Sequence, residues 1–135
     1  MKRSITLLFT LLAITFNAFA QENNDEHLLD GTSMDYYYQN GSAVHAEFID
    51  GQFHYKWIAG PNKDAEGSES YRSRKIGDRL YLVNFMVQSN SSFVTIVFNF
   101  NQNILHTSAL LAPKSDQEMI MFHGGIIEHL KFKEN

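Results

Sequence analysis

The amino-acid sequence predicts an all-β fold, an antiparallel barrel or sandwich of about seven or eight strands. Short segments rich in Val, Ile, Leu, Phe and Tyr recur along the chain at regular spacing, and these residue types favour strands. Polar or Gly-containing turns separate the segments, and no segment shows the 3.6-residue period of an amphipathic helix. Evenly spaced short strands without helices are typical of small β-barrels and sandwiches.

The first twenty residues have the pattern of a signal peptide. Two basic residues precede an apolar run over Ile5–Phe16, and an A-x-A cleavage signal ends at Ala20. A membrane anchor, the alternative, is disfavoured because the run is shorter than the ~20 residues that span a bilayer. We therefore expect export, to a bacterial periplasm or the medium, without membrane association after cleavage. Residues 1–20 are assigned to the signal peptide, 21–41 to a flexible leader and 42–135 to the barrel domain.

Charge and composition exclude several classes of partner. After the predicted signal peptide is removed, nine basic and fifteen acidic residues remain, a formal charge of −6. Neither nucleic acid nor an anionic membrane is therefore an expected partner. The chain contains no cysteine, so an exported domain of this size must be held together by its core alone. No cofactor is predicted, and the oligomeric state is left open.

The first clear element is a hairpin over Ser42–Ile58. Asp50-Gly51 between alternating segments is a strong hairpin signal, because a type I′ turn needs positive φ at both central residues. A two-residue turn pairs Phe48 with Phe53, and period-two alternation then divides the side chains between two faces. The inward face carries Val44, Ala46, Phe48, Phe53, Tyr55 and Trp57, and the outward face carries His45, Glu47, Gln52, His54 and Lys56.

The later strands lie between turn residues, and most of them are apolar. Ser68–Ile76 is polar, and we interpret it as an edge strand. A two-residue turn at Gly77-Asp78 would bring Arg72 next to Val83 and Arg74 next to Tyr81. The last two form a pair around a turn at residues 123–125. The predicted strands are Ser68–Ile76, Arg79–Val87, Phe93–Phe100, Ile104–Ala112, Met119–Phe122 and Ile126–Lys133.

His106 is the histidine that we expect in or at the mouth of the interior. A three-residue loop at Asn101–Asn103 would pair it with Phe98, on a strongly apolar face. A buried polar group needs a partner, which indicates a pocket or a small internal network. Two other interpretations stay open: a hydrogen-bonded core histidine, or a register shift of one residue that places the ring in solvent.

No catalytic constellation is recognisable in the sequence. The chain has no cysteine, no G-x-S-x-G motif and no phosphate-binding glycine pattern. We place the acidic residues in the leader, the loops and the outward face of the first hairpin, whereas acid–base chemistry needs a carboxylate on an inward face. His54 opposite Glu47, with His45 two residues along the same face, has a spacing that could hold a divalent metal. We expect that face to be solvated, however, and assign no metal site to it. The sequence therefore predicts no catalytic and no metal-binding residue.

Aromatic residues are the positive functional signal. An aromatic-lined barrel with few polar groups can hold a small apolar or aromatic ligand, and Arg72 at the mouth could meet a ligand carboxylate. The other interpretation is that the rings fill the core, because an eight-stranded barrel is just wide enough for side chains or one small ligand. The predicted ligand-binding residues are Tyr55, Trp57, Arg72, Tyr81, Phe85, Phe98 and His106.

The order of aromatic and apolar residues between Ala43 and Leu111 resembles a known family. The segments Tyr55-Lys56-Trp57, Glu69-Ser70-Tyr71, Lys75–Phe85 and Val94–Phe100 are similar to the small calycin-like barrels of the MoaF family. These barrels share a lipocalin-like shape with phenolic acid decarboxylases. The resemblance implies an antiparallel up-and-down barrel with a central pocket.

The same resemblance weakens the case for an enzyme. In the decarboxylase branch, a Tyr, a Trp and a catalytic Glu would fall on Tyr81, Phe85 and Val87, so valine replaces the acid. We therefore expect an exported lipocalin-like barrel that binds a small apolar or aromatic ligand. One alternative is a non-hydrolytic enzyme that acts on a small phenolic-type substrate through Tyr81, Arg72 and His106. Another is a structural or interaction module with a filled core.

Overall fold

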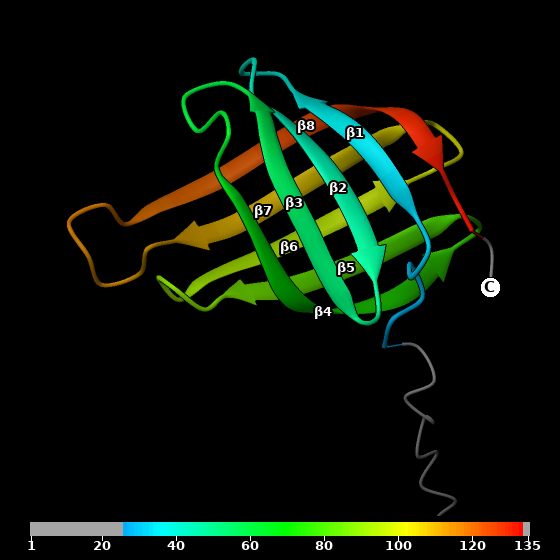
Figure 1. Ribbon diagram of the computed structural model, residues 1–135, viewed down its shortest axis with the longest axis horizontal. Helices are drawn as coiled ribbons and strands as arrows, with labels where there is room; N and C mark the ends of the chain where they lie inside the picture. Colours follow the sequence, from blue (N-terminus) through cyan, green and yellow to red (C-terminus); the bar gives the residue numbers. More distant parts are fainter. Residues whose placement is uncertain (1–25, 134–135) are drawn as a thin grey trace, which may run out of the picture.

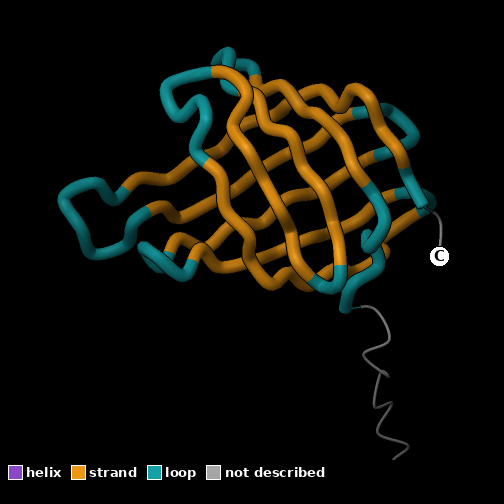
Figure 2. The backbone as a smooth tube through the Cα atoms, in the orientation of Figure 1, coloured by secondary structure: helices purple, strands orange, loops and turns teal. Residues whose placement is uncertain are grey.

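The computed structural model describes residues 26–133, which form a closed barrel of strands (Figure 1). Each strand pairs antiparallel with the next along the chain, and β8 pairs with β1, so the predicted up-and-down barrel is confirmed. Figure 2 shows only strands and loops in this part of the chain. The strands are β1 Ser33–Tyr38, β2 Ala43–Ile49, β3 Gln52–Ala59, β4 Glu66–Gly77, β5 Leu80–Val87, β6 Ser92–Asn99, β7 Ile104–Leu111 and β8 Met119–Lys131.

The strand connections define two ends of the barrel. One, the closed end, carries the short turns 50–51, 78–79 and 100–103. The other, the open end, carries the longer connections 39–42, 60–65, 88–91 and 112–118. At the left of Figure 1, β7 and β8 carry the last of these connections beyond the rest of the open end.

Residues 26–32 cover the closed end. Leu29 is fully buried, and the backbone N–H of Gly31 donates to the carbonyl oxygen of Phe48 at 2.7 Å. The prediction of a flexible leader over 21–41 is therefore wrong for the described residues from 26 onward, because one apolar side chain in a polar stretch plugs the barrel and β1 completes its wall. The predicted signal peptide and residues 21–25 lie outside the described residues. No helix within 26–133 is long and apolar enough to cross a membrane.

Aromatic rings fill the closed half of the interior. The Phe48 ring lies 4.9 Å from Phe53 and 4.8 Å from Tyr71, measured between centroids, and all three side chains are at most 1% exposed. The Tyr71 hydroxyl donates to Asp30 Oδ1 at 2.8 Å. Burial, followed by this contact with Asp30, raises the pKa of Tyr71 well above its ordinary value. The buried hydroxyl is thus both protonated and satisfied, which a buried polar group requires.

The hairpin turning at Asp50-Gly51 is confirmed together with its register. Phe48 pairs with Phe53, and Glu47 pairs with His54. Asp50 and Gly51 have φ values of 50° and 74°, the positive values that a type I′ turn needs. The predicted inward face is buried or half-buried along its whole length.

The predicted register between β4 and β5 is wrong by one residue. Arg72 pairs with Asn84 and Arg74 with Leu82, because the turn falls on Asp78-Arg79 and a bulge follows Lys75. Both arginines are exposed on the outside of the barrel. Since the barrel is closed, β4 is not an edge strand as its polar sequence had indicated.

His106 lies outside the barrel, and its predicted interior position is wrong. The turn between β6 and β7 has four residues, 100–103, rather than three. Val97 therefore pairs with His106, and Phe98 pairs with Leu105. A shift of one residue moves a strand's side chains to the opposite face, so Leu105 takes the inward position and His106 is exposed.

β8 is one continuous strand, whereas the sequence predicted two strands around a Gly-containing turn. It pairs with β7 on one side and β1 on the other. A Cβ atom on Gly125 would lie 2.8 Å from the carbonyl oxygen of Tyr37 on β1. Glycine at this position permits the close approach of the neighbouring strand β1, which a larger residue would prevent.

Candidate ligand-binding site at the open end

Inward-facing side chains are less buried at the open end than at the closed end. Phe48, Phe53 and Phe98, toward the closed end, are at most 1% exposed. A set of inward-facing side chains near the open end is only half-buried, so solvent reaches residues that line the inside of the wall. These residues are Tyr55, Trp57, Val87, Leu111, Met121 and His123.

A hydroxyl pair spans the interior between β1 and β7. The Tyr38 hydroxyl lies 2.7 Å from Thr107 Oγ1, and burial raises the pKa of Tyr38, which keeps that hydroxyl protonated. The Tyr38 ring lies 6.4 Å from Trp57 and 6.2 Å from His123. The pair thus orients one ring toward the aromatic and imidazole groups of the open end.

Glu69 on β4 faces the interior, where we expected no carboxylate from the sequence. It pairs with the inward-facing Phe53 and is 9% exposed. Its Oε2 atom accepts from the backbone N–H of Gln88 at 3.3 Å, which places the carboxyl beside the end of β5. Within residues 26–133 no hydrogen bond is found for Oε1, so this oxygen can accept from a ligand.

The assignment of acidic residues to loops and outward faces is therefore wrong at Glu69. A signal for its position was available, because Glu69 precedes Tyr71 by two residues and the side-chain period of a strand is two. An inward Tyr71 requires an inward Glu69. The polar composition of this strand had instead indicated an edge strand with solvated side chains.

Tyr55 connects the carboxylate to the aromatic wall. Its ring stacks on Phe53 at 5.6 Å and on Phe85 at 6.4 Å, between centroids. A Cβ atom on Gly67 would overlap the Tyr55 hydroxyl, so glycine on β4 makes room for this side chain. Burial and then the negative charge of Glu69 raise the pKa of Tyr55. Its phenol is thus a hydrogen-bond donor close to an acceptor.

The structure separates the predicted ligand-binding residues into three groups. Tyr55 and Trp57 lie at the open end, half-buried and inward-facing, and Phe85 adjoins them at 7% exposed. Tyr81 and Phe98 are inward but belong to the packed closed half, with Tyr81 5.7 Å from Phe100 and Phe98 0% exposed. The third group, Arg72 and His106, lies outside the barrel.

The trio of Tyr81, Arg72 and His106 therefore does not form a site. Tyr81 points into the closed half, and the other two point outward from β4 and β7. A catalytic constellation needs its groups within hydrogen-bond reach of one reacting position. The alternative of an enzyme acting through these three residues is excluded by their placement.

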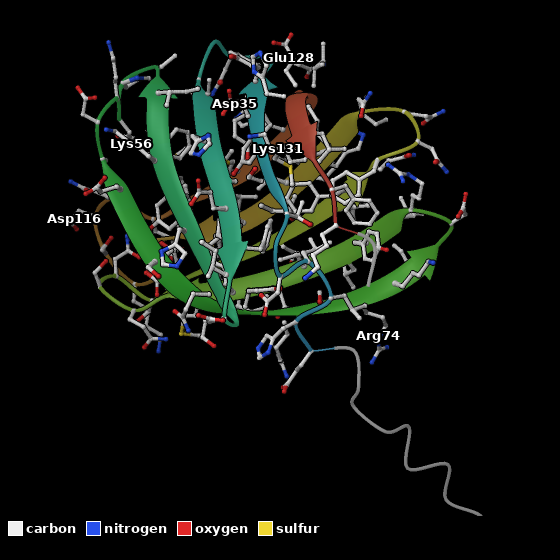
Figure 3. The ribbon with its side chains drawn as sticks, turned by 45° about the vertical axis from the view of Figure 1, so that its right-hand side comes forward. Asp35, Lys56, Arg74, Asp116, Glu128 and Lys131 are labelled. Atoms are coloured by element: carbon white, nitrogen blue, oxygen red, sulfur yellow. The ribbon has the colours of Figure 1, made fainter. Side chains whose placement is uncertain are left out.

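A second polar cluster lies on the outer surface of β8, β1 and β2. His45 Nδ1 lies 2.6 Å from Asp35 Oδ1 and its Nε2 lies 3.2 Å from Glu47 Oε1, while His129 Nδ1 lies 3.0 Å from Asp35 Oδ2. Figure 3 labels Asp35 beside Glu128 on the neighbouring strand. Among residues 26–133, no group of three or more His, Asp or Glu side chains is arranged to hold a metal ion.

A depression with a volume of about 510 Å³ adjoins this cluster on the outside of β2, β3 and β4. Its lining is mostly polar and outward-facing, and His54 and Glu47 lie opposite each other in it, as the hairpin register requires. Tyr55 is the one tyrosine in its lining, which contains no Phe or Trp, so the depression has no aromatic wall comparable with that of the open end. Its lining residues are His45, Glu47, His54, Tyr55, Lys56, Glu66, Gly67 and Ser68.

Comparisons with known proteins agree with this barrel. A search of curated proteins finds no match. A crystal structure described as a "putative beta-lactamase" from Burkholderia vietnamiensis is similar, with a TM-score of 0.65 and 15% identity over 73% of this chain and 92% of that chain; at this identity the likeness shows the fold alone. The model of the MoaF N-terminal domain matches residues 9–110. Because that match spans more than half of the 135 residues, the chain belongs to the MoaF N-terminal domain family.

Proposed function

We propose that this protein is an exported barrel that binds one small aromatic or apolar molecule through its open end. The observation that carries the proposal is the contrast between the two ends. The closed half is packed with rings at most a few per cent exposed, whereas inward-facing Tyr55 and Trp57 are half-buried. Aromatic faces that are inward but reachable are the groups on which a planar ligand stacks.

Polar groups at the same end supply orientation. Glu69 Oε1 is available as an acceptor, and the Tyr55 phenol beside it is a donor. A few placed polar groups in an apolar site fix the orientation of a ligand and provide specificity. A phenol, an indole or another ring that carries a donor group matches this arrangement better than a plain hydrocarbon.

Binding can be tested through Trp57, the only tryptophan in the chain. The protein purified from its own host would first be examined by native mass spectrometry for a retained ligand. Titration with phenols, indoles and fatty acids should then quench or shift the Trp57 fluorescence. Tyr55→Ala should weaken the binding of a ring ligand about tenfold, the size of one aromatic contact with its burial.

Arg72→Ala and His106→Gln are the matched controls, because both residues lie outside the barrel. These variants should bind as the unaltered protein does. A protein that retains no ligand and whose fluorescence responds to no compound would disprove the binding function. If Arg72→Ala and His106→Gln lost as much ligand affinity as Tyr55→Ala, the location of the binding site inside the open end would be disproved.

Export is a separate part of the proposal and rests on the sequence pattern of residues 1–20. The full chain expressed in a bacterium should be recovered from the periplasm or the medium with Gln21 at its N-terminus. Edman sequencing or intact-mass measurement of that material decides the matter. Recovery of the uncleaved chain from the cytoplasm would contradict export.

Glu69 favours a second candidate function, an enzyme that acts on a small phenolic acid. The Glu69 carboxylate accepts a hydrogen bond from the backbone N–H of Gln88 and so lies beside the end of β5. It is therefore close to Val87, the position on which the resemblance to phenolic acid decarboxylases would place a catalytic Glu. A buried carboxylate next to a tyrosine is a pair suited to general acid–base work. Incubation with phenolic acids, followed by chromatography, should show turnover that Glu69→Gln abolishes. Binding without turnover supports the first candidate.

A further inference from the structure

The outer surface of the barrel is divided into a charged half and an uncharged half. Figure 3 labels Asp35, Lys56 and Arg74, which project from β1, β3 and β4. Outward positions of β5, β6, β7 and the first part of β8, up to Ile126, form four paired rows without any Asp, Glu, Lys or Arg, called the uncharged face below. The charged residues of β8, Glu128 and Lys131, lie farther along the strand, beside β1. The rows are Met86–Phe93–Leu110–Ile120, Asn84–Thr95–Ser108–Phe122, Leu82–Val97–His106–Gly124 and Leu80–Asn99–Ile104–Ile126.

Large apolar side chains on this face are exposed to solvent. Ile120 is 75% exposed and Phe122 is 78% exposed, both on β8 where it leaves the barrel with β7. Met86, Phe93 and Leu110 continue the same row across three strands with 41–43% exposure, and Ile126 adds 59%. A fully exposed large side chain has about 180 Å² of surface. Multiplied by their exposed fractions, these six side chains together present on the order of 600 Å² of apolar surface.

That area matches the apolar part of a stable protein–protein interface. A standard interface buries about 800 Å² on each partner, of which roughly 60% is apolar. The largest apolar patch on a typical monomer is about 300–600 Å², and patches at the upper limit mark interaction sites. A covering partner therefore accounts for the face.

Charge indicates which partner fits. Without the predicted signal peptide the chain carries nine basic and fifteen acidic residues, a formal charge of −6, so two copies repel each other. In a two-fold dimer the same patch contacts itself, so a patch with an excess of one charge would repel its own copy. A face without charges avoids this repulsion. It also has no Lys or Arg to attract anionic lipid headgroups.

We propose that the protein forms a two-fold symmetric homodimer through the uncharged face, with Ile120 and Phe122 of β8 at the centre of the contact. Residues 119–123 of β8 pair with β7 but not with β1. The contact is placed on outward side chains and not on strand addition, because Ile120 and Phe122 are the most exposed large apolar groups of this segment.

Sedimentation velocity over a dilution series tests the proposal on the full mature chain. The unaltered protein should sediment with twice the mass of one chain. Phe122→Glu and, separately, Ile120→Lys should each raise the dissociation constant at least a hundredfold, because each places like charges in contact across the two-fold axis. Both side chains are already mostly exposed, so circular dichroism should show an unchanged barrel.

Ser68→Glu, an outward change on the charged half, is the matched control and should leave the dimer unchanged. A monomeric unaltered protein at submillimolar concentration overturns the proposal. So does a dimer that both Phe122→Glu and Ile120→Lys leave intact. If the monomer instead floats with neutral phosphatidylcholine vesicles and Phe122→Glu prevents it, the face binds lipid and the dimer is wrong.

Discussion

His45 shows how one side chain ties three strands together at the outer surface. It lies on β2, bonds Asp35 on β1 and Glu47 on its own strand, and through Asp35 it is linked to His129 on β8. The hydrogen bond to Asp35 raises the pKa of His45, burial opposes that rise, and Glu47 adds to it. Cross-strand pairs of opposite charge stabilise a sheet, so this cluster supports the closure between β8, β1 and β2.

The raised pKa of His45 makes its contribution depend on pH. Folding favours the protonated ring, so its stabilisation is complete below the ordinary histidine value of about 6.5 and is lost as pH rises through the raised folded value. His45→Gln should therefore lower the free energy of unfolding more near pH 5.5 than near pH 8, by less than about 1 kcal/mol because the pair is solvent-screened. Urea titrations at both pH values, at one protein concentration, measure this difference.

His54→Gln provides the comparison for that measurement. His54 lies on the neighbouring strand on the same outward side, and within residues 26–133 no ion pair involves it. The two variants should differ only at the lower pH. A His45 variant whose loss of stability is the same at both pH values would show that its protonation contributes nothing.

β8 shows how a strand can carry residues that predict a turn. Gly124 and Gly125 interrupt an otherwise apolar segment, yet the strand continues through them and pairs on both sides. A Cβ on Gly125 would meet backbone, the Tyr37 carbonyl, whereas a Cβ on Gly124 would meet the end of the His106 ring at 3.2 Å. Only the first contact involves atoms that cannot move aside without shifting a strand.

Gly125→Ala should therefore destabilise the barrel more than Gly124→Ala does. The expected loss for Gly125→Ala is about 1–3 kcal/mol, the range for an overpacked site, and the loss for Gly124→Ala should be smaller because a side chain can rotate away. Urea unfolding followed by Trp57 fluorescence measures both. Equal stabilities of the two variants would show that β1 does not depend on the close approach to β8.

At the scale of the whole molecule, the barrel has one filled end and one accessible end. The segment 26–32 closes the first, with Leu29 fully buried as part of the hydrophobic core. The second is bounded by longer connections and half-buried rings. A barrel of eight strands has room for side chains or for one small ligand. Side chains fill the closed half here, and the proposed ligand would bind in the open half.

Leu29→Ala tests whether residues 26–32 are part of the folded domain. Removing a fully buried leucine side chain should lower the free energy of unfolding by about 2–5 kcal/mol. Leu28→Ala, at a half-buried position next to it, should cost clearly less. Chemical denaturation at one protein concentration compares them. A negligible loss for Leu29→Ala would mean that the segment is dispensable, as a flexible leader would be.

The sequence by itself determined the all-β class, the Asp50-Gly51 hairpin with its faces, and the family resemblance. These rest on local alternation, on turn residues with special φ values and on residue types that favour strands. Tyr55 and Trp57 followed from the same hairpin, and they are the predicted site residues at the open end.

Only the tertiary structure decided which residues of the other strands face inward. The turn of 100–103 and the bulge after Lys75 each shift a register by one residue, and one residue exchanges the inside and the outside of a strand. That exchange moved His106 and Arg72 out of the expected site. The fold also decided which face of the polar strand β4 is turned inward: Tyr71 packs in the ring cluster, and the side-chain period of two carries Glu69 to the same face.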